Sequence, residues 1–142
     1  MTAPGLRAEL TAVPDAADLA VLGDGLAAFN ESDVGPSGRK ALAVLLRDAQ
    51  GAVQGGLSGY TAWGWLYVQW LWLAAPQRGQ GWAARLLAMA EDEARLRGCH
   101  GAWIDTFNPA ALAAYRRAGY TPFGALADFP RGRSRTFLQK QL

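Results

Sequence analysis

The stretch that decides the fold lies between residues 71 and 83 and reads Leu71-Trp72-Leu73-Ala74-Ala75-Pro76-Gln77-Arg78-Gly79-Gln80-Gly81-Trp82-Ala83. It joins an apolar run of strand length to a segment whose leucines and alanines recur at helical spacing. Glycines at such a junction let backbone N–H groups approach a ligand, and the N-terminus of the helix supplies about half a positive charge. With the cation of Arg78, the turn is suited to a phosphate or pyrophosphate. A purely steric role for its glycines is the alternative.

The same turn also fits a dinucleotide-binding fingerprint, in which Gly79, Gly81 and Ala84 follow a strand and Asp105 ends the next one. Two features count against this interpretation. Five residues separate Leu73 from Gly79, whereas the first glycine of that fingerprint sits directly at the end of its strand. Fewer than sixty residues follow the turn, which is too few for the rest of a doubly wound sheet. A P-loop is excluded because the chain has no Gly-Lys-Ser/Thr.

Outward from this turn, periodicity and turn residues predict a mixed sheet covered by helices, which is an α+β fold. A first helix begins at Pro14-Asp15, and residues 30–38 form a loop after it, with room for one helical turn. A second helix follows the glycine turn and ends at Gly98, with Glu91 on its solvent side, and a third covers residues 109–118 with Asn108 as its N-cap. The predicted strands cover residues 6–13, 41–46, 53–63, 65–73, 101–106, 119–124 and 134–139.

Composition predicts one globular domain that spans residues 1–142. Hydrophobic residues make up 51% of the chain and charged residues only 18%, which excludes an intrinsically disordered chain. The net charge of +2 argues against general binding of nucleic acids. Residues 1–75 hold seven acids and four bases, whereas residues 76–142 hold five acids and ten bases. Two halves of opposite sign suggest two kinds of partner surface, and the basic half begins at the turn that is suited to a phosphate.

Other counts exclude several classes of site. Cys99 and His100 are the single cysteine and histidine, so an intramolecular disulfide, a cysteine-rich metal site and a zinc site with two histidines are excluded, and no metal is expected. The apolar stretch from residue 63 to 76 is too short to span a bilayer, so no membrane association is expected. The first residues do not resemble a signal peptide, and a cytoplasmic protein is the expectation.

Two motifs resemble the GNAT superfamily of acetyl-CoA-dependent N-acetyltransferases. The turn is similar to the acetyl-CoA motif of that family, Gln/Arg-x-x-Gly-x-Gly/Ala, which paired leucines follow, here Leu86-Leu87. About thirty residues later, Asn108, Ala111, Tyr115 and Gly119-Tyr120 resemble the second motif of the family. The order of elements also resembles the GNAT fold, which implies a mixed, mostly antiparallel sheet of six to seven strands. About four helices flank that sheet, and its strands splay apart at the cofactor site.

The resemblance implies roles for individual residues. The strand segment Leu71–Leu73, with Trp72 at its centre, would pair with the pantetheine arm of acetyl-CoA. The Leu71 N–H would donate to the thioester carbonyl, a contact worth about 3–4 kcal/mol. Asn108 would bind the cofactor arm, and Tyr115 would act as the general acid that protonates the leaving thiolate. The backbone that cradles the pyrophosphate would be that of Arg78, Gly79, Gln80, Gly81, Trp82 and Ala83.

Simpler roles stand beside these. Asn108 is also suited to cap its helix, and Tyr115 could be a half-buried aromatic residue. Glu31, Asp33 and Asp105 are candidates for the base, and Glu31 and Asp33 are also candidates for acceptor binding, although isolated carboxylates are more often solvated. No base is assigned, and His100 is interpreted as structural.

The aromatic and arginine runs have two interpretations each. The even spacing of Trp63 and Trp65 places that pair on one face of its strand, and the same holds for Trp70 and Trp72. Packing in the core is the favoured role of these tryptophans, and the alternatives are a wall of the acceptor site and a dimer contact. The alternating arginines at 131, 133 and 135 are interpreted as a solvated strand face, with binding of an anion as the alternative.

The predicted activity is transfer of acetyl from acetyl-CoA to a primary amine by direct attack in a ternary complex. Cys99 lies away from both motifs, so an acetyl-cysteine intermediate is not expected. A small-molecule amine and a protein amine are both open as acceptor, and a homodimer is open as well. The alternatives are a GNAT-fold module that binds acyl-CoA without turnover and, less favoured, a dinucleotide-binding domain.

Overall fold

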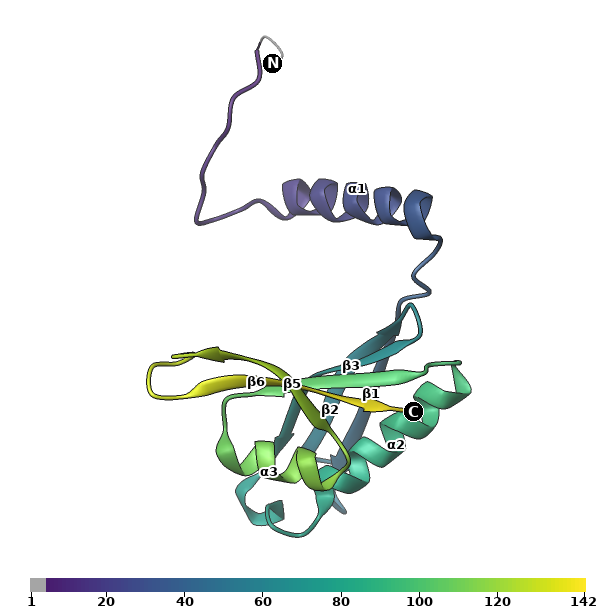
Figure 1. Ribbon diagram of the computed structural model, residues 1–142, viewed down its shortest axis with the longest axis vertical. Helices are drawn as coiled ribbons and strands as arrows, with labels where there is room; N and C mark the ends of the chain where they lie inside the picture. The colour runs from purple at the N-terminus through teal and green to yellow at the C-terminus, as the bar shows by residue number, and fades with distance from the viewer. Residues whose placement is uncertain (1–4) are drawn as a thin grey trace. The chain divides into compact units, whose positions relative to one another are not determined.

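The computed structural model describes residues 5–142 (Figure 1). Contacts divide the chain into two compact units, Met1–Ser37 and Gly38–Leu142. The prediction of a single domain stays a prediction. Among the described residues, no helix combines the length and the apolar character that crossing a membrane requires.

The first unit contains helix α1 (Ala16–Val34), which confirms the first predicted helix. The Asp15 side chain caps it by accepting a hydrogen bond from the Ala17 N–H, and Gly35 ends it with a φ of 89°. The helical turn that the prediction allowed within residues 30–38 is observed, because residues 30–34 form the last part of α1 and the loop begins at Gly35. The strand predicted over residues 6–13 was wrong. The described part of this unit contains no strand that could pair with it.

The second unit is a six-stranded sheet in the order β1-β2-β3-β4-β6-β5. Only the β3–β4 pair is parallel, and the other pairs are antiparallel. The strands are β1 (Lys40–Arg47), β2 (Val53–Ala62), β3 (Trp65–Leu73), β4 (Gly101–Thr106), β5 (Thr121–Ala127) and β6 (Ser134–Gln141).

Two helices and a short 3-10 turn complete this unit. The turn η1 (Ala75–Gln77) leads from β3 to α2 (Trp82–Leu96), and α3 (Pro109–Arg117) follows β4 (Figure 1). Helix α2 packs on β1, β2 and β3, and α3 packs on β4 and α2. Their apolar faces form one core with the sheet, which includes Leu66, Leu87, Ile104, Tyr115 and Leu138. The predicted α+β class is confirmed.

Strands β3 and β4 diverge within the sheet. They pair only where Trp65–Val68 lies opposite Gly101–Ile104. Beyond that point β3 stays with β2, and β4 stays with β6. The register shift between Ser58 and Gly59 leaves Gln69 as an extra residue on β3, which is a β-bulge that bends the strand. A Cβ on Gly59 would overlap the Tyr67 carbonyl oxygen, so the bulge requires glycine there. The expected splaying is therefore observed.

Candidate active site

The turn after β3 owes its shape to two glycines in the left-handed region. Gly79 has a φ of 74° and Gly81 a φ of 80°, and a Cβ on either would meet nothing within 4 Å. Backbone conformation, rather than crowding by neighbours, therefore selects glycine. Two side chains fold back on the turn: Arg78 Nε donates to the Leu73 carbonyl over 3.0 Å, and Gln80 Nε2 donates to the Pro76 carbonyl over 2.7 Å.

This turn forms one wall of a cavity of about 890 Å³. Arg117, on the last turn of α3, lines the cavity together with Arg78, and no carboxylate is among the lining residues. Arg117 was missed, because its contribution depends on how α3 packs. Gln80 is the one predicted cofactor-binding residue that does not line the cavity. The predicted residues that do are Leu71, Trp72, Leu73, Arg78, Gly79, Gly81, Trp82, Ala83, Asn108 and Tyr115.

Asn108 lines this cavity and caps α3. Its Oδ1 accepts hydrogen bonds from the Ala110 N–H over 2.9 Å and from the Ala111 N–H over 3.0 Å. The predicted capping role is confirmed. Because the carbonyl oxygen of the side chain is used by the helix, the amide nitrogen remains to donate to a ligand.

Tyr115 lies two turns further along α3 and is 5% exposed. Burial, and then the negative charge of Asp105, raise the pKa of its phenol to about 12. Tyr115 is therefore protonated at neutral pH and carries the proton that a general acid must donate. The alternative interpretation, a half-buried aromatic residue, was wrong about the burial of Tyr115, which is almost complete.

A second cavity, of about 490 Å³, lies where β3 and β4 diverge. Its walls include Gln69 at the bulge, Asp105 at the end of β4, and the exposed side chains of Trp70 and Phe107. The two cavities share four lining residues, so they meet at one place in the fold. These shared residues are Leu71, Trp72, Thr106 and Tyr115.

Asp105 is held at the second cavity by an ion pair. Arg135 on β6 donates to Asp105 Oδ1 through Nη2 over 2.6 Å and through Nε over 2.8 Å. The Tyr67 hydroxyl donates to the other oxygen, Oδ2, over a longer 3.4 Å. Burial and the charge of Asp105 raise the pKa of Tyr67. The interpretation of Arg135 as part of a solvated face was wrong, because β4 and β6 pair and bring it to Asp105.

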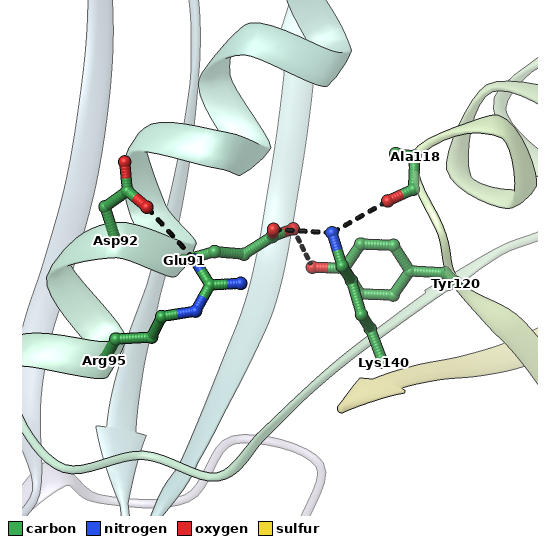
Figure 2. Close-up of polar contacts among 6 residues, drawn as sticks. All are labelled: Glu91, Asp92, Arg95, Ala118, Tyr120 and Lys140. Carbon is green, nitrogen blue, oxygen red and sulfur yellow. Dashed lines mark hydrogen bonds and ion pairs between the residues drawn. The ribbon is translucent and has the colours of Figure 1, made fainter. Parts of the chain in front are cut away.

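A second polar cluster, which joins α2 and β6 to the end of α3 (Figure 2), contributes no residue to either of these two cavities. Glu91 on α2 is 3% exposed and accepts from the Tyr120 hydroxyl over 2.8 Å and from Lys140 Nζ over 2.7 Å. Lys140 also donates to the Ala118 carbonyl over 2.9 Å. The Tyr120 N–H donates to the Tyr115 carbonyl, so this cluster is continuous with the helix that carries Tyr115. The placement of Glu91 on the solvent side was therefore wrong.

Three of the tryptophans that were expected to pack in the core, Trp63, Trp70 and Trp72, lie outside it. Trp63 lies in the turn between β2 and β3 with a φ of 47°, so the predicted 63/65 pair on one strand face was wrong. Trp70 and Trp72 are 68% and 56% exposed, so they do not belong to the core. Both line the second cavity. The preference for core packing was therefore wrong for these three tryptophans.

The remaining candidates lie elsewhere. His100 contacts the Gly64 carbonyl through Nδ1 over 2.9 Å, which agrees with a structural role. Cys99 is buried, and burial raises the pKa of its thiol. Glu31 and Asp33 lie at the end of α1 in the first unit, within the helix rather than in a loop, and their contact with an acceptor stays a prediction.

Comparison with known proteins agrees with this architecture. The sequence profile of the acetyltransferase (GNAT) family matches residues 23–120. Acetyltransferase Atu2258 of Agrobacterium fabrum is 48% identical over 132 residues, which covers 93% of this chain and 96% of that protein. Blasticidin-S acetyltransferase of Streptomyces morookaense is 39% identical over 94 residues, which covers 66% of this chain and 69% of that protein.

A solved structure extends the agreement to three dimensions. The crystal structure of an Agrobacterium tumefaciens protein assigned as an acetyltransferase superposes with a TM-score of 0.93 and 46% identity. The match covers 96% of this chain and 100% of that one. With both motifs, the splayed sheet and these relatives in agreement, the chain belongs to the GNAT family of acetyltransferases.

Proposed function

We propose that the protein transfers the acetyl group of acetyl-CoA to a primary amine by direct attack of the amine on the thioester. The observation that carries the proposal is the meeting of two chemically different cavities at Leu71 and Tyr115. One cavity contains two arginines and no carboxylate, and the other contains an aspartate paired with Arg135 and exposed aromatic residues. One suits a polyanionic thioester and the other an amine.

The residues of the larger cavity fit acetyl-CoA. Gly79 and Gly81 leave open space where any other residue would place a Cβ, so backbone N–H groups can approach the diphosphate at the start of α2. Arg78 and Arg117 supply positive charge. The β3 segment from Gln69 to Leu73 has no β4 partner in register, so its free edge is suited to pair with the amide groups of the pantetheine arm.

Leu71 and Tyr115 perform the two electrostatic tasks of the transfer. The Leu71 N–H donates to the carbonyl oxygen as negative charge develops on it. The amine nitrogen forms a bond to the carbonyl carbon, the carbon–sulfur bond breaks, and the Tyr115 hydroxyl gives its proton to the leaving sulfur. The amine loses its proton to solvent or to a carboxylate.

One relative is named as an acetyltransferase of blasticidin S, which supports a discrete molecule rather than a protein as the acceptor of this chain. The test is release of free CoA thiol from acetyl-CoA over a panel of amines that includes small molecules, lysine peptides and peptides with free N-termini. Thiol release that requires an amine is expected. Binding of acetyl-CoA without release across the panel would favour a non-catalytic acyl-CoA module, and thermal stabilisation by NAD but not by CoA would favour a dinucleotide-binding domain.

A further inference from the structure

We propose that Asp105 receives the ammonium group of the acceptor, and that the acceptor is a small primary amine attached to an apolar or flat group. The inference rests on the proposed function, since it names the substrate class of the same site. It arises from three features of the second cavity: its single carboxylate, its exposed aromatic walls and its size.

The carboxylate of Asp105 has one oxygen that can accept a further hydrogen bond. Arg135 places both of its contacts on Oδ1, whereas Oδ2 accepts only the 3.4 Å hydrogen bond from Tyr67 among the hydrogen bonds found within residues 5–142. A carboxylate oxygen can accept two hydrogen bonds, so Oδ2 retains capacity for an N–H donor. The side chain is 10% exposed, and a donor that reaches it does so through the cavity that it lines.

Arg135 lines the second cavity beside Asp105, so the negative charge of that carboxylate is paired there rather than free. The same charge contributes to the raised pKa of Tyr115, the residue that the two cavities share. Asp105 is also the only carboxylate among the residues that line the second cavity. An ammonium group that enters from this side therefore meets a fixed acceptor next to Leu71 and Tyr115.

The aromatic walls define the rest of the acceptor. Trp70, Trp72 and Phe107 line the same cavity and are 68%, 56% and 48% exposed. Such surfaces bury the apolar or flat part of a ligand and attract a cation over the face of a ring. A cavity of about 490 Å³ lies in the range that holds a small molecule. Arg135 acts as a positioning residue, because it fixes the carboxylate through the oxygen that the acceptor does not use.

Calorimetric titration tests the inference without turnover. The probes are phenethylamine, tyramine and 4-phenylbutylamine, each matched to the alcohol that replaces its amine, with CoA present at saturation. We expect the wild-type protein to bind at least one amine about 10-fold or more tightly than its alcohol. Asp105→Asn should reduce that preference to about 2-fold or less. Asp92→Asn, which removes an exposed carboxylate paired with Arg95 on α2, should leave it unchanged.

The wild-type measurement is decisive even where a variant does not fold. Equal affinity for every amine and its alcohol, or no binding of any amine, overturns the inference. Steady-state kinetics separates it from the proposed function: Asp105→Asn should raise KM for the amine about 10-fold or more and leave KM for acetyl-CoA unchanged. Amine-dependent thiol release with an unaltered amine KM in Asp105→Asn overturns the inference and leaves the function intact. Amine binding that depends on Asp105 but is accompanied by no thiol release supports the inference and overturns the proposed function.

Discussion

Glu91 and Lys140 form an ion pair of 2.7 Å between α2 and β6, and its carboxylate is almost fully buried. The same carboxylate accepts the Tyr120 hydroxyl, and Lys140 also holds the Ala118 carbonyl at the end of α3 (Figure 2). This cluster joins α2 and β6 to the end of α3, the helix that carries Tyr115. Its polar groups satisfy one another, so loss of one member leaves the others buried and unpaired.

Glu91→Gln should lower the free energy of unfolding by about 2–3 kcal/mol. It leaves the largely buried Lys140 ammonium without its counter-charge, and breaking a fully buried pair costs about 3–5 kcal/mol. Asp92→Asn is the matched control, since Asp92 pairs with Arg95 on the same helix, both side chains are exposed, and the change should cost less than about 1 kcal/mol. Urea denaturation of both variants checks the prediction. Equal losses would show that the cluster contributes no more than a surface pair.

Stability should fall between pH 10 and pH 12, in part because of Tyr115. Its folded pKa of about 12 lies above the ordinary value of 10, so the folded state binds more protons than the unfolded state in that window. The stabilisation is complete below pH 10 and is lost as the pH rises through the folded pKa. A pKa difference of two units corresponds to about 2.7 kcal/mol in the free energy of unfolding. The free energy of unfolding of the wild-type protein should therefore fall by up to that amount more than that of Tyr115→Phe. Denaturant unfolding at pH 9 and pH 11.5 measures it, and parallel curves for both proteins would disprove it.

Gly79→Ala and Gly81→Ala should each cost about 1 kcal/mol of stability and weaken binding of acetyl-CoA about 10-fold or more. Both positions have a left-handed φ, and each Cβ would enter space that we assign to the diphosphate. Gly132→Ala is the control: Gly132 has a φ of 83°, open surroundings and no place among the residues that line either cavity. It should lose similar stability and keep its affinity in calorimetry. Wild-type affinity in Gly79→Ala and Gly81→Ala would remove the turn from the binding site.

Gly59→Ala should destabilise the sheet by about 3 kcal/mol, because the new Cβ overlaps the backbone oxygen of Tyr67 on β3. Relief requires loss of the bulge at Gln69, which would also close the gap between β3 and β4. Gly124→Ala, on β5 with open surroundings and an ordinary φ, should be neutral within about 0.5 kcal/mol. Thermal unfolding compares the two, and similar midpoints would contradict the account of the splayed sheet.

Local signals predicted the elements around the site well. The strand over residues 101–106 has the predicted bounds, and α3 begins after Asn108 as predicted, because capping and periodicity are local properties. The strand predicted over residues 6–13 failed because alternation says nothing about whether a partner strand exists.

Long-range contacts could not be predicted from local patterns. The pair of Asp105 and Arg135 spans 30 residues and depends on the register of β4 with β6, and Glu91 meets Lys140 across 49 residues. The acceptor carboxylate that we propose, Asp105, belongs to the basic half of the sequence. The prediction of an anionic ligand for that half stays a prediction, and the charge split does not point to Asp105.

The most direct test of the central claim is the rate of CoA thiol release by the wild-type protein and by Tyr115→Phe, with saturating acetyl-CoA and an amine from the panel. Removal of the hydroxyl deletes the proton donor and leaves the ring in the core, so kcat should fall about 100-fold. The dissociation constant for acetyl-CoA, measured alongside, should change less than about 2-fold. Turnover of Tyr115→Phe equal to that of the wild type would contradict the assignment of Tyr115 as the general acid at the meeting of the two cavities.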